Sequence, residues 1–230
     1  WLTPLAFETL NFDGFDCVIS VTSAEAKYII TKPETVHICY CLTPTRYLWS
    51  GHEEYLTRPG TGGLDWLSRP IFRSVAPTLR NWDYQAAARP DAYIAISQRV
   101  KERISRYYGR TVEEVIYPPV DTRQFRISTH PGKTHHKPYY LTVTRLVGYK
   151  RTDILIDACT RLGRNLVVVG SGREYTKLKK RAGKTITFVE GKLTDDEVRR
   201  YYQECRAFVF AADEDFGIAA AEAQACGKPV

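Results

Sequence analysis

The chain has 230 residues, of which 43% are hydrophobic, and 33 lysines and arginines against 26 acidic residues give it a formal net charge of +7. A chain of this length and composition can bury a full hydrophobic core, which excludes a disordered, collagen-like or miniature protein. No apolar run approaches the roughly 18 residues that a membrane span needs. The basic excess favours anionic partners, although most basic residues recur at helical spacings typical of solvated helix faces.

The six cysteines indicate the redox environment of the protein. They form no C-x-x-C pair, and five of the six lie inside apolar runs, as buried free thiols do. This usage favours a reducing, cytoplasmic setting over a disulfide framework or a zinc site.

The first 127 residues contain short segments rich in β-branched and aromatic residues, which predict strands. Strands are expected at residues 16–22, 36–41, 91–97 and 113–117, with helices near 66–88 and at 98–108. Residues 128–137 are polar, contain proline and glycine and show no periodicity, so they are predicted to form a linker. The chain would therefore consist of an N-terminal domain (1–127), this linker and a C-terminal domain (138–230).

In the C-terminal domain, strand-like and helix-like periods alternate. Strands are expected at 139–144, 165–169, 185–190 and 207–211, and helices at 152–162, 174–182, 195–204 and 218–226. Thr194 and Glu197 match a capping box, and Gly227 marks the end of the last helix. The alternation predicts right-handed βαβ units and therefore an α/β fold with a parallel, Rossmann-like sheet.

Ligands of an open parallel sheet bind beyond the carboxyl ends of its strands, so the segments that follow the predicted strands should converge. Arg145 can chelate phosphate oxygens, and Lys150 adds a compact positive charge. The amides of Phe216–Ile218 open a helix, and a helix N-terminus attracts anions. Glu214 and Glu222 accept hydrogen bonds from sugar or ribose hydroxyls. The sequence thus predicts a site for a phosphorylated ligand with a hydroxylated body.

Motifs along the whole chain occur in the same order as in a known family. They are YCLTPTRYLW (40–49), YIAIS (93–97), VIYPPVD (115–121), VTRLVGYK (143–150), GSG (170–172) and EDFGIAAAEAQACGKPV (214–230). They resemble the retaining glycosyltransferases of family 4, and Glu214 and Glu222 fit the E-x7-E signature of that family. The resemblance implies the GT-B fold, with two Rossmann-like domains that face each other. Both domains are expected to be incomplete, the chain being the middle of a longer protein.

The resemblance implies transfer of a hexose from a nucleotide-diphosphate donor, such as GDP-mannose or a UDP-sugar, with retention of anomeric configuration. Arg145 and Lys150 would hold the diphosphate and stabilise the leaving group, and Glu214 would contact the transferred sugar. The residues expected to bind the rest of the donor are Gly170, Gly172, Phe216, Gly217, Ile218 and Glu222. The donor is a substrate and no cofactor or metal is implied, because Arg145, Lys150 and the helix N-terminus supply positive charge.

The acceptor implied by the resemblance is a glycan or a lipid-linked glycan. The setting would be polysaccharide biosynthesis in the cytoplasm, with peripheral association at the inner membrane face. No nucleic-acid partner is expected, because the sequence contains no known nucleic-acid-binding module.

Some residues allow other interpretations. Gly170 and Gly172 are equally typical of a tight strand-to-helix turn, and Asp213-Glu214-Asp215 also satisfies the D-x-D metal motif of the other glycosyltransferase fold. Leu42 stands where similar transferases often have histidine, and leucine cannot bind a sugar hydroxyl. The alternative function is therefore a non-catalytic homologue that binds sugar nucleotides or glycans.

Overall fold

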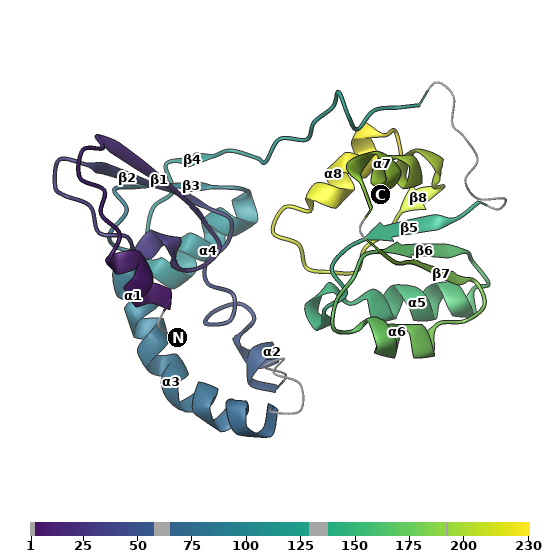
Figure 1. Ribbon diagram of the computed structural model, residues 1–230, viewed down its shortest axis with the longest axis horizontal. Helices are drawn as coiled ribbons and strands as arrows, with labels where there is room; N and C mark the ends of the chain where they lie inside the picture. Colours follow the sequence, from purple (N-terminus) through teal and green to yellow (C-terminus); the bar gives the residue numbers. More distant parts are fainter. Residues whose placement is uncertain (1–2, 58–64, 129–137, 192) are drawn as a thin grey trace. The chain divides into compact units, whose positions relative to one another are not determined.

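The computed structural model of the chain describes residues 3–57, 65–128, 138–191 and 193–230. The chain forms two compact units, Trp1–Pro118 and Pro119–Val230, here the N-terminal and C-terminal units (Figure 1). Each unit contains a parallel four-stranded sheet. The prediction of an α/β protein with two Rossmann-like parallel sheets is therefore confirmed.

Along the sequence, the boundary between the two units follows residue 118, whereas the predicted N-terminal domain ended at residue 127. Phe125 is buried in the core of the C-terminal unit, and Val120 packs against the same core. The segment after Pro118 therefore belongs to the C-terminal unit, although it precedes the first strand of that unit. Of the predicted linker, residues 129–137 lie outside the described part of the chain.

The N-terminal unit contains the strands predicted for it. They are β1 (Cys17–Thr22), β2 (Val36–Cys41), β3 (Ala92–Ala95) and β4 (Glu114–Val115), and the helices are α1 (Thr3–Glu8), η1 (Glu25–Tyr28), α2 (His52–Thr57), α3 (Asp65–Ala86) and α4 (Gln98–Tyr108). Helix α4 has its predicted bounds because Ser97 caps its start and Gly109, at φ +64°, ends it. Helices α1, η1 and α2 were not predicted, since segments of four to six residues carry little periodic signal.

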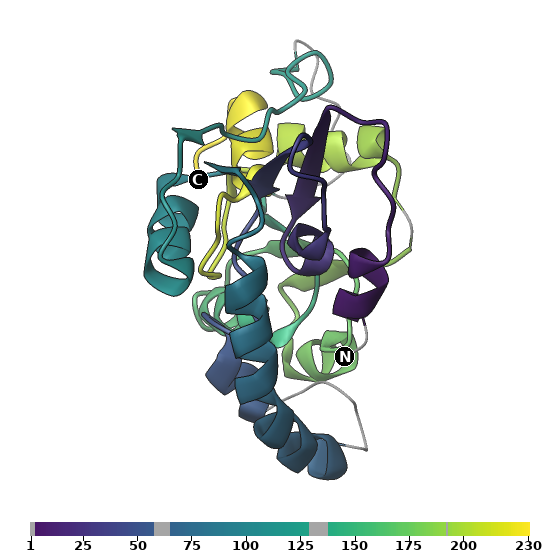
Figure 2. The same ribbon diagram turned by 90° about the vertical axis from the view of Figure 1, so that its left-hand side faces the viewer.

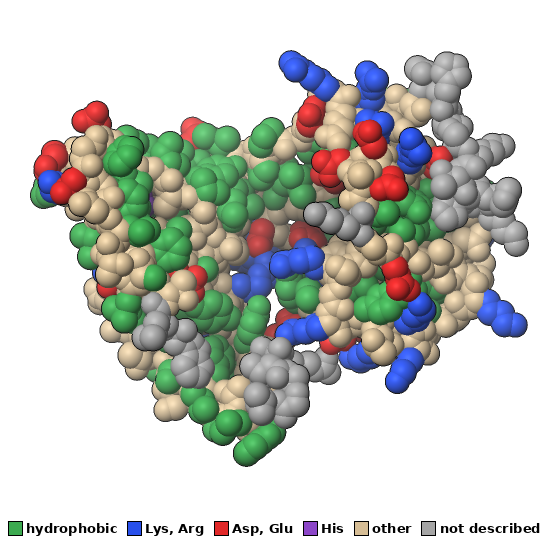
Figure 3. Space-filling view, viewed as in Figure 1, with side chains coloured by type: hydrophobic (Ala, Val, Ile, Leu, Met, Phe, Trp, Pro, Cys, Tyr) green, Lys and Arg blue, Asp and Glu red, His purple; other side chains and the backbone are tan. Residues whose placement is uncertain are grey.

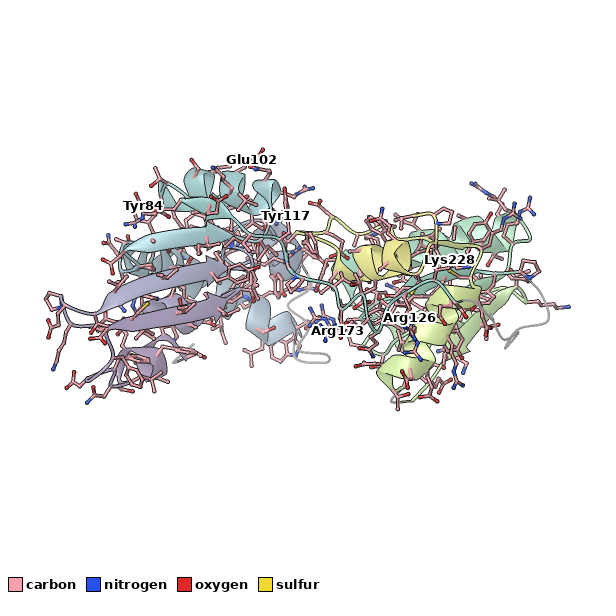
Figure 4. All side chains as sticks on the ribbon, turned by 90° about the horizontal axis from the view of Figure 1, so that it is seen from above. Tyr84, Glu102, Tyr117, Arg126, Arg173 and Lys228 are labelled. Carbon is pink, nitrogen blue, oxygen red and sulfur yellow. The ribbon has the colours of Figure 1, made fainter. Side chains whose placement is uncertain are left out.

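The helices of the N-terminal unit lie on one side of its strands (Figures 1 and 2). The strand order is β1-β2-β3-β4, so each right-handed crossover steps the same way and falls on the same face. Figure 4 looks onto the opposite face, which no helix among the described segments of this unit covers. On that face, Ile19 and Val21 are 63% and 60% exposed.

A buried carboxylate lies at the centre of the N-terminal unit. Both oxygens of Asp83, a fully buried residue of α3, accept hydrogen bonds. The donors are Lys27 Nζ at 2.6 Å, Thr45 Oγ1 and Trp49 Nε1 at 2.7 Å, and the hydroxyls of Tyr28 and Tyr108 at 2.9 Å. Burial by itself raises the pKa of Asp83, but the Lys27 ammonium and the other donors hold it below its usual value. The network ties the loop after β2 to α3 and η1.

The C-terminal unit alternates strands and helices as predicted. The strands are β5 (Tyr140–Val143), β6 (Leu166–Val169), β7 (Ile186–Val189) and β8 (Ala207–Phe208), and the helices are η3 (Gly148–Lys150), α5 (Thr152–Arg161), α6 (Tyr175–Arg181), α7 (Asp195–Glu204) and α8 (Ile218–Ala225). The capping box of Thr194 and Glu197 is present at the start of α7, and Gly227 adopts φ +74° just beyond α8. Strand β8 is shorter than the predicted 207–211, because the chain leaves the sheet after Phe208.

Both faces of the C-terminal sheet are covered. The strand order is β7-β6-β5-β8, so the chain steps one way from β5 to β7 and then crosses to the far side of β5. Helices α5 and α6 therefore cover one face and α7 and α8 the other (Figure 1). Leu166 and Val168 face the first layer, and Val167 and Val169 face the second, so the whole of β6 is buried.

Candidate functional site

A pocket lies where the strand order of the C-terminal sheet reverses. Strands β5 and β8 are neighbours, but the connections that follow them lead to opposite faces, which is the arrangement that leaves a crevice at the carboxyl edge. The pocket is lined by Thr142–Thr144 at the end of β5, by Lys150, and by Glu214 and Gly217 in the segment between β8 and α8. Two of the segments predicted to converge, 145–150 and 213–217, thus contribute residues to one pocket.

An ion pair spans this pocket. Lys150 Nζ lies 2.6 Å from one carboxylate oxygen of Glu214 and 2.8 Å from the other, so it donates to both. The Lys150 side chain is 16% exposed and the Glu214 side chain 25%. Lys150 ends the 3-10 turn η3, and Arg151 then turns the chain into α5 with φ +49°. Two residues that the sequence assigned to phosphate and to sugar contact each other directly.

Arg145 lies at the same edge of the sheet but does not line this pocket. Its guanidinium donates to the hydroxyl of Tyr149 at 2.7 Å. The next residue, Leu146, is fully buried, and its amide donates to the carbonyl of Ser171 at 2.8 Å. This anchor leaves Arg145 exposed on the loop that leads to Lys150.

Gly170 and Gly172 allow the loop after β6 to pack against the loop after β5. A Cβ on Gly170 would lie 1.9 Å from the carbonyl oxygen of Thr144, and one on Gly172 would lie 2.4 Å from that of Leu146. No side chain fits at such distances. The structure therefore gives both glycines a packing role, in line with the turn interpretation, while their contact with a donor stays a prediction.

The N-terminus of α8 borders the pocket. Gly217 precedes the helix with φ +83°, and a Cβ there would lie 3.6 Å from the Cβ of Glu214. The first amides of a helix have no partner within the helix, so those after Gly217 add partial positive charge beside Glu214. Phe216 is partly buried and Ile218 is 47% exposed.

Glu222, the second acid of the motif, has different surroundings from Glu214. It is partly buried on α8, does not line the pocket of Lys150, and accepts a hydrogen bond from the hydroxyl of Tyr202 on α7 at 2.9 Å. Burial raises the pKa of Glu222, the hydrogen bond from Tyr202 lowers it in part, and the nearby Asp195 raises it further. Sequence reasoning did not identify Tyr202, because its contact with Glu222 joins two helices.

Sequence reasoning also missed Asp83 and Lys27, although the apolar pattern around Asp83 contained a signal. Asp83 lies on the same face of α3 as the buried Phe72, Ala76 and Leu79, where a charge is unusual. The hydrogen-bond network around Asp83 includes Thr45 and Trp49. These two residues lie on either side of Arg46 in the loop at the carboxyl end of β2. Leu42 and Arg46 are both partly buried there.

The described ranges contain neither a metal-binding cluster nor a helix able to span a membrane. No group of three or more His, Cys, Asp or Glu side chains is close enough there to hold a metal ion, and Asp213 and Asp215 form no such group with Glu214. All six cysteines are free, and four of them are buried. In the same part of the chain, no helix combines the length and the apolar character needed to span a bilayer.

Two comparisons with known sequences give matches to glycosyltransferases. Residues 124–230 match the model of the family described as Glycosyl transferases group 1. The chain is also similar to the uncharacterized glycosyltransferase MJ1178 of Methanocaldococcus jannaschii, with 35% identity over 94 residues. That match includes 39% of this chain and 27% of the relative, so the chain spans about a quarter of the length of the curated relative it matches.

Solved structures of glycosyltransferases share the fold. Sucrose-phosphate synthase from Thermosynechococcus elongatus superposes with a TM-score of 0.64 at 16% identity, over 98% of this chain and 57% of that one. The catalytic domain of starch synthase IV from Arabidopsis thaliana gives a TM-score of 0.58 at 14% identity, over 93% and 55%. Such low identities establish the fold alone. The chain has the GT-B fold, and residues 124–230, which make up most of its C-terminal unit, are similar to the group 1 glycosyltransferases.

Proposed function

We propose that the protein is a retaining, metal-independent hexosyltransferase of family 4. It would move a sugar from a nucleotide-diphosphate donor to a glycan or lipid-linked acceptor. The observation that carries the proposal is the meeting of Lys150, Glu214 and the α8 N-terminus at the reversal point of the C-terminal sheet. A crevice at this point is where open parallel sheets bind nucleotides.

The proposed roles follow the chemistry of the groups. As the bond between the anomeric carbon and the donor phosphate breaks, negative charge develops on the leaving diphosphate and positive charge on the sugar ring. Lys150, Arg145 and the amides at the start of α8 stabilise the leaving group, and Gly170 and Gly172 bring its binding loop close. Glu214 holds the sugar, and Glu222 accepts from the ribose hydroxyls.

The cellular setting is proposed from the cysteines and the net charge. A cytoplasmic enzyme of polysaccharide assembly, loosely associated with the membrane, accords with the free cysteines and the basic surface. The resemblance to family 4 supplies the acceptor class.

The decisive experiment is donor turnover by the complete protein against a panel of nucleotide sugars. Sugar transfer, or slow hydrolysis of one donor, is expected. Lys150→Ala and Glu222→Ala should each weaken donor binding, whereas Lys177→Ala, at an exposed position on α6, should not. Binding of a nucleotide sugar without any turnover would instead favour the non-catalytic alternative. If both alanine variants keep the wild-type donor affinity, the proposed pocket is wrong.

A further inference from the structure

The ion pair of Lys150 and Glu214 involves both groups that the proposed function gives to the donor. Lys150 donates to both oxygens of Glu214, at 2.6 and 2.8 Å, and its ammonium has only three hydrogens to donate. Neither side chain is more than a quarter exposed. The structure therefore has the phosphate-binding cation already paired with the sugar-binding carboxylate.

A phosphate group cannot simply join this pair. A carboxylate and a phosphate that share one ammonium repel each other, and the low exposure of both side chains weakens the screening of that repulsion by water. A phosphate that binds Lys150 must therefore displace Glu214. The N-terminus of α8, whose partial positive charge attracts anions, borders the displaced carboxylate.

We propose that Lys150 exchanges Glu214 for the donor's phosphate, and that this exchange makes Glu214 available to the hydroxyls of the sugar. The inference rests on the proposed function and adds an order of events to it. A neutral sugar has no charge with which to compete for Lys150. Glu214 then stays paired with Lys150 and is not available to the hydroxyls of that sugar. The pair thus selects ligands that carry phosphate and sugar together over free sugars.

The exchange is tested by titrating the chain with inorganic pyrophosphate in a calorimeter at low ionic strength. Glu214→Gln removes the competing charge and keeps the shape of the side chain, so it should bind pyrophosphate about three- to tenfold more tightly than the wild type. Lys150→Met should lose the binding. Asp213→Asn, which removes the same charge one residue away, should change the affinity less than about twofold.

The outcomes separate the exchange from the phosphate site itself. If Glu214→Gln binds pyrophosphate no better than the wild type, or less well, Glu214 helps to hold Lys150 in place and the exchange is wrong. An equal gain from Asp213→Asn also overturns it, because the effect is then general electrostatics. If neither the wild type nor Glu214→Gln binds pyrophosphate, the proposed phosphate site fails and the exchange with it. Thermal unfolding of each variant verifies that it is folded.

Discussion

The two units build the same kind of sheet and cover it differently. Each has four parallel strands, but the N-terminal order β1-β2-β3-β4 never reverses, whereas the C-terminal order β7-β6-β5-β8 does. Since right-handed crossovers that step one way fall on one face, only the reversal places helices on both faces. The covered C-terminal sheet has two apolar cores, while Ile19 and Val21 remain exposed on the N-terminal sheet. Direction of connection, rather than strand composition, decides which sheet is covered.

The units also differ in charge. Residues 1–118 contain 13 basic and 13 acidic residues, whereas residues 119–230 contain 20 and 13, so the C-terminal unit carries the entire net charge of +7. On the face shown in Figure 3, many blue lysine and arginine side chains lie on the C-terminal unit, and green hydrophobic side chains cover much of the N-terminal unit. The excess charge therefore accompanies the pocket proposed to bind a diphosphate.

The largest effect on stability is expected at the polar centre of the N-terminal unit. Asp83→Ala leaves Lys27, which is 2% exposed, without its carboxylate, and should destabilise the unit by about 3–5 kcal/mol. Urea unfolding followed by tryptophan fluorescence measures this, because Trp1, Trp49, Trp66 and Trp82 all lie in the N-terminal unit. Glu102→Ala, at an exposed position on α4, is the control and should cost less than about 1 kcal/mol. Equal costs would contradict a central role for Asp83.

The next effect is expected in the apolar core of the C-terminal unit. Leu141→Ala removes a fully buried side chain from β5 and should cost about 2–5 kcal/mol. Hydrogen exchange of the β5 and β6 amides reports it, since this unit contains no tryptophan. Leu162→Ala, 65% exposed in the same unit, is the matched control and should change exchange little. Similar losses in both variants would mean that Leu141 is not part of a packed core.

A smaller effect, which depends on pH, is expected from Glu222. Its pKa is raised in the folded state, so the folded protein binds the proton more tightly and loses stability as the pH rises from the unfolded pKa through the folded one. Glu222→Gln lacks this loss and still accepts from Tyr202. The variant should be more stable than the wild type at pH 7, by less than about 1 kcal/mol, and the difference should vanish below pH 4. Unfolding curves of both proteins at pH 7 and below pH 4 measure this difference in stability. A difference that does not depend on pH would contradict the raised pKa of Glu222.

The smallest effect is expected on the uncovered face of the N-terminal sheet. Ile19→Thr keeps a β-branched residue at a position that is 63% exposed and should change stability by no more than about 0.5 kcal/mol. The matched change Val167→Thr, on the buried β6, should cost well over 1 kcal/mol. A large loss from Ile19→Thr in this chain would contradict the exposed face.

Local sequence determined most of the secondary structure. Helix α4 and strand β2 have their predicted bounds because caps, breakers and periodicity act within a few residues. The loops of the candidate site were also predictable, since the alternation of strand and helix implies a parallel sheet and its carboxyl edge. The short helices α1 and α2 were not, because six residues hold too little pattern.

Only the tertiary structure decided what these residues contact. Lys150 and Glu214 are 64 positions apart, and Lys27 and Asp83 are 56 apart, so no local pattern could pair them. The sequence placed Glu214 and Glu222 in one motif, but packing of α8 against α7 directs Glu222 to Tyr202 while Glu214 faces Lys150. The sequence by itself therefore determined the elements and the edge of the sheet that carries the chemistry. The order of strands in space decided which charges meet there, because pairing in the sheet brings together segments that the chain keeps far apart.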